Sequence, residues 1–211
     1  MSSTPPNTRS VKIGQDERGG WSSDRPRPGG ARPANISTRC RLLSPTDRLR
    51  YSPGSLVVVV SPSASVRDRF VERLIEDRSS LLSLAKVRAL IAGRVPDEDV
   101  DERAGELLTA TVQKRLASSD TVVIPVESLD PAEREPFVRA AAVAKRPRHI
   151  ILVEPPKAAV AEEDRAALNE LRRALDAGEL GEEGFQTALR LGGGSVGELK
   201  RILFRPPPKD D

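Results

Sequence analysis

Residues 55–75 read SLVVVVSPSASVRDRFVERLI and decide the fold. The apolar run 56–60 is typical of a strand that is buried on both faces, as in a parallel sheet. A loop of small residues, 61–65, follows this run. Apolar residues then recur at helical spacing, at Val66, Phe70, Leu74 and Ile75. A buried strand, a short loop and an amphipathic helix are therefore predicted in immediate succession.

This order of elements is the frame of a phosphate-binding loop, in which backbone N–H groups and a helix N-terminus face an anion. The pattern GxxxxGK[ST] would need glycine at positions 61 and 66, lysine at 67, and serine or threonine at 68. The chain has Ser61, Val66, Arg67 and Asp68 at these positions. We interpret the following residues as a vestigial phosphate loop: Ser61, Ser63, Ser65, Val66, Arg67 and Asp68.

Each departure from the pattern has a physical consequence. Val66 would be strained if the loop required a positive φ, which glycine adopts freely. Arg67 keeps the positive charge of the usual lysine, but its guanidinium is larger and planar. Asp68 replaces the hydroxyl that binds magnesium and sets a carboxylate where a triphosphate would lie. Because phosphoryl transfer depends on positioning and charge neutralisation, we expect these changes to abolish it.

The rest of the chain alternates between the two kinds of pattern. Apolar runs at 81–84, 121–126, 149–153 and 200–204 predict further strands. Helical spacing and capping signals predict helices at 86–91, 100–116, 130–144, 162–177 and 182–191, with Gly178 as a C-cap and a flexible turn at 192–194. The predicted fold class is α/β, with three layers like a P-loop NTPase and a mainly parallel sheet of about five strands flanked by helices.

Composition divides the chain of 211 residues. Residues 1–35 are rich in Pro, Gly, Ser and Arg and lack apolar periodicity, so we expect them to be disordered. Residues 36–54 are predicted to be an extended transition segment. The expected division is a basic tail with that segment at 1–50, a domain at 51–205 and a C-terminal tail at 206–211. A single cysteine, Cys40, excludes an intrachain disulfide.

Charge is uneven along the chain, because residues 1–50 carry ten Lys or Arg against four Asp or Glu. No apolar run approaches the ~18 residues needed to cross a membrane, and the start of the chain lacks the apolar core of a signal peptide. We therefore expect a cytoplasmic protein with no membrane partner. The basic tail indicates an unidentified protein partner or a nucleic acid.

From residue 56 to 205 the chain resembles the P-loop kinases of the bacterial polynucleotide kinase type, which include AAA-family and zeta-toxin-like ATPases. In that family an Asp-x-x-Arg motif supplies the general base; this chain has Ala85 and Arg88 there. The family's metal-side aspartate corresponds to Pro125. The resemblance implies that Arg134 takes the place of a usual arginine. The family also has a lid helix with arginines that face the phosphates, and Arg165, Arg172 and Arg173 are the candidates for these positions.

Three functions remain open at this point. The first is a catalytically degenerate P-loop kinase-like protein that acts as a binding or scaffold module, with no catalytic residue, metal ligand or cofactor assigned. The second is an ATP- or GTP-binding kinase or ATPase with an unconventional loop, which would bind ATP and Mg²⁺ and use Glu127 or Asp68 as an acid or metal ligand. The third is a nucleic-acid-binding protein that uses the basic tail and residues 145–149. The second function would draw on a possible anion site formed by Arg67, Arg88, Arg134 and Arg165.

Overall fold

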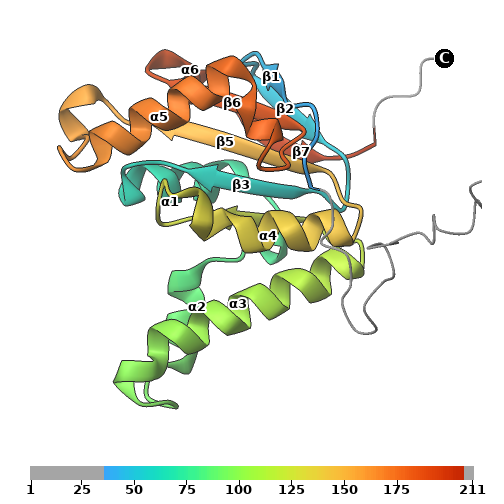
Figure 1. Ribbon diagram of the computed structural model, residues 1–211, viewed down its shortest axis with the longest axis vertical. Coiled ribbons are helices and arrows are strands. Elements are labelled where there is room, and N and C mark those ends of the chain that lie inside the picture. The colour runs from blue at the N-terminus through green and yellow to red at the C-terminus, as the bar shows by residue number, and fades with distance from the viewer. Residues whose placement is uncertain (1–35, 207–211) are drawn as a thin grey trace, which may run out of the picture. The chain divides into compact units, whose positions relative to one another are not determined.

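The computed structural model describes residues 36–206 (Figure 1). The disorder expected of residues 1–35, and most of the short C-terminal tail, lie outside the described residues. The main sheet has five strands, and every neighbouring pair in it is parallel. This confirms the predicted α/β class with a parallel sheet. In spatial order the strands are β1 (Arg41–Leu43), β6 (Thr187–Gly192), β5 (Arg148–Glu154), β3 (Leu56–Val60) and β4 (Val122–Pro125).

Strand β3 is buried on both faces, as its continuous apolar sequence predicts. Leu56, Val58 and Val60 belong to one hydrophobic core, whereas Val57 and Val59 belong to another on the opposite face of the sheet. The sheet therefore forms the middle of three layers. The first core includes residues of α3 (Val100–Ala117), α4 (Pro131–Val143) and α5 (Asp164–Ala177). The second includes residues of α1 (Ala64–Leu74), β2 (Arg48–Tyr51) and β7 (Arg201–Phe204).

The number of strands in the main sheet agrees with the prediction, but two of its members differ. The predicted helix at 182–191 is wrong, because residues 187–192 form β6, which lies between β1 and β5 in the sheet. Ala188, Leu189 and Leu191 are buried there. Alanine, leucine and arginine favour helices in isolation, but pairing with β5 and β1 overrides that preference.

The predicted strand at 81–84 is reduced to one bridge. Leu81 pairs in parallel with Val123 of β4, and the Leu82 N–H donates to the Val123 carbonyl at 3.0 Å. The strand ends there because Ser83 caps a helix, its side chain accepting from the Lys86 N–H at 3.2 Å. Helix α2 (Leu84–Ile91) begins at the next residue.

Strands also occur where an extended transition segment was expected. Within residues 36–54, β1 joins the edge of the main sheet beside β6. Strand β2 pairs in parallel with β7, the predicted last strand, in a separate two-stranded sheet. A short helix, α6 (Gly194–Glu198), begins at the last residue of the segment expected to be a flexible turn.

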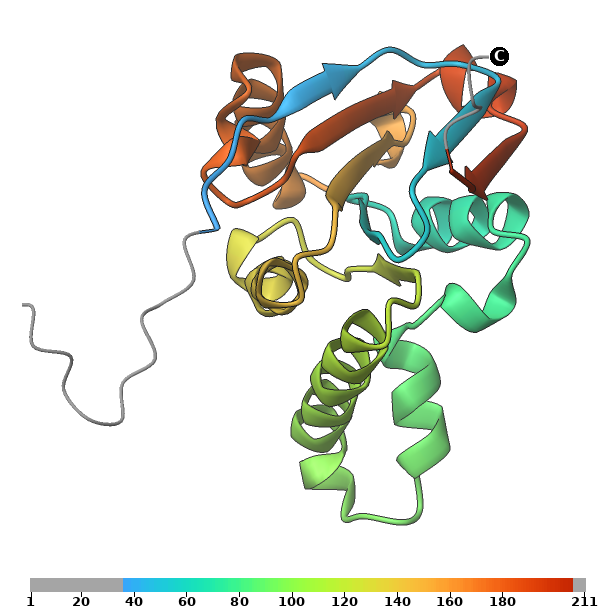
Figure 2. The same cartoon turned by 90° about the vertical axis from the view of Figure 1, so that its right-hand side faces the viewer.

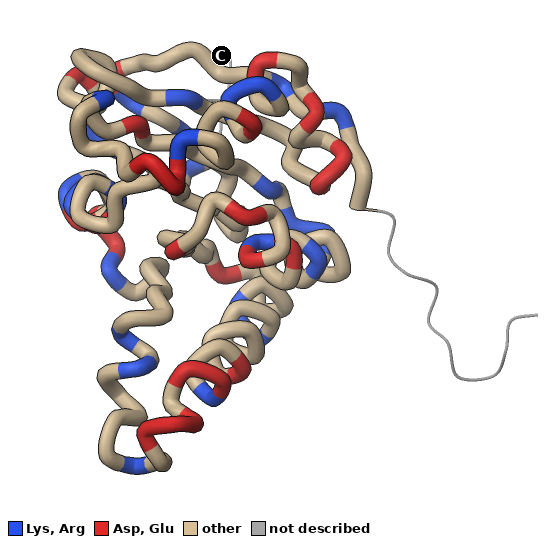
Figure 3. The backbone as a smooth tube through the Cα atoms, turned by 60° about the vertical axis from the view of Figure 1, so that its left-hand side comes forward, with Lys and Arg blue, Asp and Glu red and all other residues tan. Residues whose placement is uncertain are grey.

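Helices α2 and α3 pack against each other and form a hairpin that extends away from the sheet (Figure 2). Acidic residues gather where α3 begins (Figure 3). Such residues suit the positive end of a helix dipole. Among the helices of residues 36–206, none combines the length and the hydropathy needed to cross a bilayer.

Candidate functional site

The strand order places a crevice at the carboxyl ends of the central strands. From β3 the chain passes to β4 on one side, and it then returns to form β5 on the other side of β3. In open α/β sheets, ligands bind outside the carboxyl ends of the strands where the order reverses in this way. The segments that follow β3, β4 and β5 are therefore the candidate site, and they contain most of the residues predicted from the sequence.

The loop after β3 is shorter than a phosphate loop. Helix α1 begins at Ala64, so the connection consists of residues 61–63. The Ser61 hydroxyl accepts from the Ser63 N–H at 3.2 Å, and the Ser63 hydroxyl lies 3.3 Å from that of Ser65. Val66 lies within α1 and has no positive φ, so the strain expected of it does not arise.

Arg67 also lies within α1, and its side chain is directed into the protein. It is 5% exposed, and its Nη1 donates at 2.8 Å to the carbonyl of Val126, the residue that follows β4. Its Nε donates to Asp68 Oδ1 at 2.8 Å. The guanidinium therefore joins α1 to the edge of the sheet and is neutralised by its neighbour. The Asp68 side chain itself is 51% exposed.

Arg88 is paired with acidic residues as well. Its Nη1 donates to both carboxylate oxygens of Glu127, at 2.9 and 2.8 Å, and its Nε donates to Asp101 Oδ1 at 2.6 Å. The hydrogen bond that Arg88 donates to Glu127 is the main cause that raises the pKa of Arg88 above its ordinary value. This network joins Arg88 of α2 and Asp101 of α3 to Glu127, which lies shortly after β4.

A cavity of about 180 Å³ separates α1 from the start of α2. Arg67 and Lys86 line it together with three carboxylates, those of Asp68, Glu72 and Glu127. Acidic groups thus outnumber basic groups around this cavity. Such a lining opposes the binding of a polyphosphate that has no cation between it and the carboxylates.

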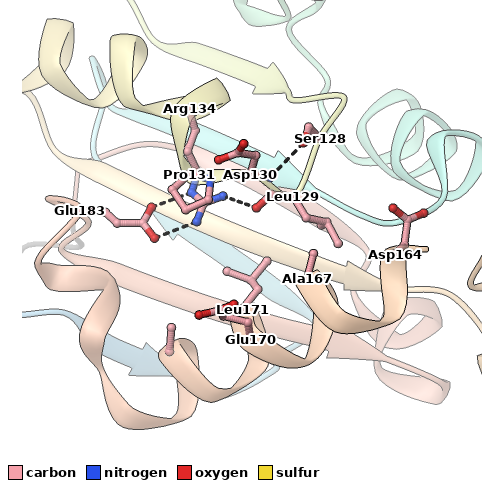
Figure 4. Close-up of a pocket in the computed structure, with 11 residues that line it drawn as sticks. Ser128, Leu129, Asp130, Pro131, Arg134, Asp164, Ala167, Glu170, Leu171 and Glu183 are labelled. Atoms are coloured by element: carbon pink, nitrogen blue, oxygen red, sulfur yellow. Dashed lines mark hydrogen bonds and ion pairs between the residues drawn. The ribbon is translucent and has the colours of Figure 1, made fainter. Parts of the chain in front are cut away.

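The other two predicted arginines lie elsewhere. Arg134 is buried, donates from Nε and Nη2 to Glu183 at 2.6 and 2.7 Å, and donates from Nη1 to the Leu129 carbonyl at 2.7 Å (Figure 4). Arg165 is exposed and pairs with Glu162. Arg67, Arg134 and Arg165 line three different cavities, so the structure does not bring the four predicted arginines together around one anion.

The sequence-based reasoning missed a cluster at the carboxyl end of β5. Glu154 is 12% exposed in its side chain and accepts from Arg172 Nε at 2.8 Å and from Arg190 Nε at 2.6 Å. Partial burial pushes the pKa of Glu154 upward, but hydrogen bonds and charges from the two arginines outweigh it and hold that pKa below its ordinary value. A glutamate directly after the apolar run 149–153 was the available signal.

The Glu154 cluster borders a cavity of about 360 Å³ between the end of β5 and α5. Lys157 and Arg165 also line this cavity. Gly193, which follows β6 and has a φ of +54°, is a further lining residue. Arg172, the third basic residue in the lining, is already paired with Glu154. Within residues 36–206, no group of three or more His, Cys, Asp or Glu side chains is placed to hold a metal ion.

Comparisons with known proteins add a distant likeness. No family model and no curated protein matches the chain. Among solved structures, the tunicamycin resistance protein of Deinococcus radiodurans is similar to it, with a TM-score of 0.39 and 16% sequence identity. The similarity covers 68% of this chain and 91% of that one.

Proposed function

We propose that the protein is a catalytically degenerate P-loop kinase-like protein that acts as a binding or scaffold module. The observation that carries this proposal is the position of Arg67. It is the residue that would replace the phosphate-binding lysine, but its guanidinium is buried between Asp68 and the Val126 carbonyl. A cation held in this way stabilises the junction of α1 and β4 and is withdrawn from an incoming phosphate.

Two further positions support the same proposal. Ala85 stands where the resemblance would require a general base, and its methyl group transfers no proton. Pro125 stands where the metal-side aspartate would lie, at the end of β4. Both residues line the same cavity as Arg67, where carboxylates are in excess. The scaffold of the fold is retained while the chemistry of phosphoryl transfer is missing.

Isothermal titration with ATP and GTP, with and without Mg²⁺, tests this proposal directly. We expect no heat of binding up to millimolar nucleotide. Binding in the micromolar range that is lost in Arg67→Ala, but kept when the exposed neighbour is changed in Arg69→Ala, would overturn it. That result would favour the alternative of a nucleotide-binding enzyme, and a search for an acceptor hydroxyl would follow.

A nucleic-acid partner is a second proposal, favoured by the excess of basic residues in residues 1–50. For such a complex the logarithm of the binding constant falls linearly with the logarithm of the salt concentration, because each neutralised phosphate releases counterions. Replacing the basic residues of positions 1–35 with glutamine should lower both the affinity for single-stranded RNA and its salt dependence. An unchanged affinity and salt slope would exclude this segment as the contact. These residues are Arg9, Lys12, Arg18, Arg25, Arg27 and Arg32.

A further inference from the structure

A groove between α4 and α5 is distinct from the cavity that Arg67, Ala85 and Pro125 line. It has a volume of about 410 Å³ and is lined by the start of α4, one face of α5 and Glu183 (Figure 4). In this view Asp164 lies at one end and Glu183 at the other, with Leu129, Ala167 and Leu171 between them. Arg134 is the lining residue that the predicted anion site would have used, and its guanidinium is paired with Glu183.

The length of the groove follows from helix geometry. Asp164, Ala167, Leu171 and Ala174 line it from α5, and their spacing of three or four residues places them on one helix face. Ten residues at 1.5 Å per residue separate the first from the last, so this wall is about 15 Å long. The middle of the groove is apolar. Ala167 and Ala174 have small side chains, so the buried Leu171 and the facing Leu129 form its floor.

The charges around this floor are strongly unbalanced. Asp130, Asp164, Glu170 and Glu183 line the groove, and Arg134 is the cation among the lining residues. Arg134 uses Nε, Nη1 and Nη2 in its bonds to Glu183 and to the Leu129 carbonyl. Its charge is therefore already matched by Glu183, and the other three carboxylates determine the field in the groove.

Within residues 36–206, the Asp164 carboxylate makes no hydrogen bond or ion pair. Glu170 pairs with Arg173 at 3.2 Å, but both side chains are 74% exposed, and such a pair contributes little. Asp130 caps α4 through one oxygen, which accepts from the Ala132 N–H at 2.9 Å. The groove therefore offers carboxylate oxygens to a cation, around an apolar floor.

We propose that this groove binds a short basic segment of a partner protein in extended conformation, with cationic side chains toward the acidic residues and an apolar side chain on the floor. The volume lies near the lower end of the ~300–1,000 Å³ that ligand sites occupy. It accommodates a few side chains but not a helix, whose diameter is about 10 Å. Five extended residues span about 17 Å, which matches the length of the wall.

This inference rests on the proposed binding role and names the chemistry of the partner. The probe is the blocked peptide Arg-Ala-Leu-Ala-Arg, titrated into the full-length protein by calorimetry at low and at physiological salt. We expect saturable 1:1 binding that weakens with salt. The same peptide with glutamate in place of arginine should not bind, because its charge is repelled by the groove.

Two pairs of variants locate the contact. Asp164→Asn removes a carboxylate from the groove, and Glu163→Gln removes one from the neighbouring position, which does not line it. Ala167→Trp fills the apolar middle, whereas Ala166→Trp adds the same bulk outside the groove. Asp164→Asn should weaken binding by about two- to fivefold, the range of an exposed ion pair. Ala167→Trp should weaken it at least tenfold, while both controls bind like the unaltered protein.

Three results would overturn the assignment: no binding of the peptide up to about 1 mM, equal losses in the paired variants, or tighter binding of the polyamine spermine in competition. The last would show a site for small cations in place of a peptide. Nucleotide titrations on the same preparation separate the two proposals. If neither the peptide nor a nucleotide binds, the groove assignment alone is refuted. If a nucleotide binds in the micromolar range, the proposed role as a binding module is refuted.

Discussion

At the scale of single residues, buried ionisable side chains carry the clearest consequences. His149 at the start of β5 has its Nδ1 2.8 Å from the Thr187 hydroxyl, and its ring centroid lies 4.3 Å from that of Tyr51. The His149 Nε2 and the Tyr51 hydroxyl are buried, and neither has a hydrogen-bond partner among residues 36–206. Burial is the main cause that lowers the pKa of His149 to about 4, and the charge of Arg148 adds to it. Neutral histidine is therefore part of the folded protein.

The first prediction concerns pH. The unfolded chain binds a proton at His149 with a pKa of 6.5, whereas the folded protein does so at about 4. The free energy of unfolding should fall as pH drops from 6.5 toward 4, by at most about 1.4 kcal/mol per pH unit from this group. Urea titrations across this range should show the loss, and His149→Gln should flatten it. An equal slope in the variant would contradict the assignment.

The second prediction concerns Arg134, which the resemblance had marked as a family arginine and which the structure places in a buried ion pair with Glu183. Arg134→Ala leaves Glu183 and the Leu129 carbonyl without their donors, and should destabilise the fold by about 3–5 kcal/mol. Arg134→Lys keeps the charge but loses the two-pronged contact, so it should recover only part of that stability. Denaturant unfolding of both variants checks this. Equal stability of the lysine variant and the unaltered protein would show that the paired hydrogen bonds from Nε and Nη2 to Glu183 do not contribute to stability.

At the scale of elements, predictability depends on how locally each element is determined. The apolar runs that became β3, β4 and β5 are too short for helices and too apolar for loops, so the sequence identified them. Residues 187–192 carry helix-favouring side chains and become a strand only because two other strands flank them. The site divides in the same way. The strand–loop–helix frame is local, but Arg67 bonds to a carbonyl 59 residues away, which periodicity does not reveal.

A third prediction tests how β1 is attached. The Thr38 N–H donates to the Gly181 carbonyl at 2.8 Å, and a Cβ at Gly181 would lie 2.0 Å from the Thr38 carbonyl oxygen. Gly181→Ala should force the segment before β1 away and cost about 1–3 kcal/mol of stability. Gly105→Ala is the control, because a Cβ there meets no atom within 4 Å and α3 should gain about 0.5–1 kcal/mol. Thermal unfolding of both proteins would reveal the opposite signs, and a neutral Gly181→Ala would contradict this packing.

At the scale of the whole molecule, segments distant in the chain complete each layer. Strand β2 pairs with β7 in the register Leu49 to Ile202, and both residues belong to the core on the α1 face of the sheet. The predicted alternation of strands and helices identified the parallel sheet, but it contained no information on this pairing. Such a pairing connects the stability of the early strands to that of the last one.

The fourth prediction measures that connection. Ile202→Ala in β7 should reduce the free energy of unfolding by about 2–5 kcal/mol, and hydrogen exchange should speed up in β2 as well as in β7. Leu90→Ala on α2 serves as the control, since this side chain is 65% exposed and its loss should change stability by less than about 0.5 kcal/mol. Protection lost in β7 alone would show that β2 is held by other contacts.

The same parallel pairings have a consequence for biosynthesis. Strands β1 and β2 are synthesised well before their partners β6 and β7. Until then the apolar side chains of Leu49 and Tyr51 have no strand to cover them. The early strands therefore wait for partners that are synthesised much later, and the nascent polypeptide passes through a stage at which chaperones that recognise exposed apolar segments find a target.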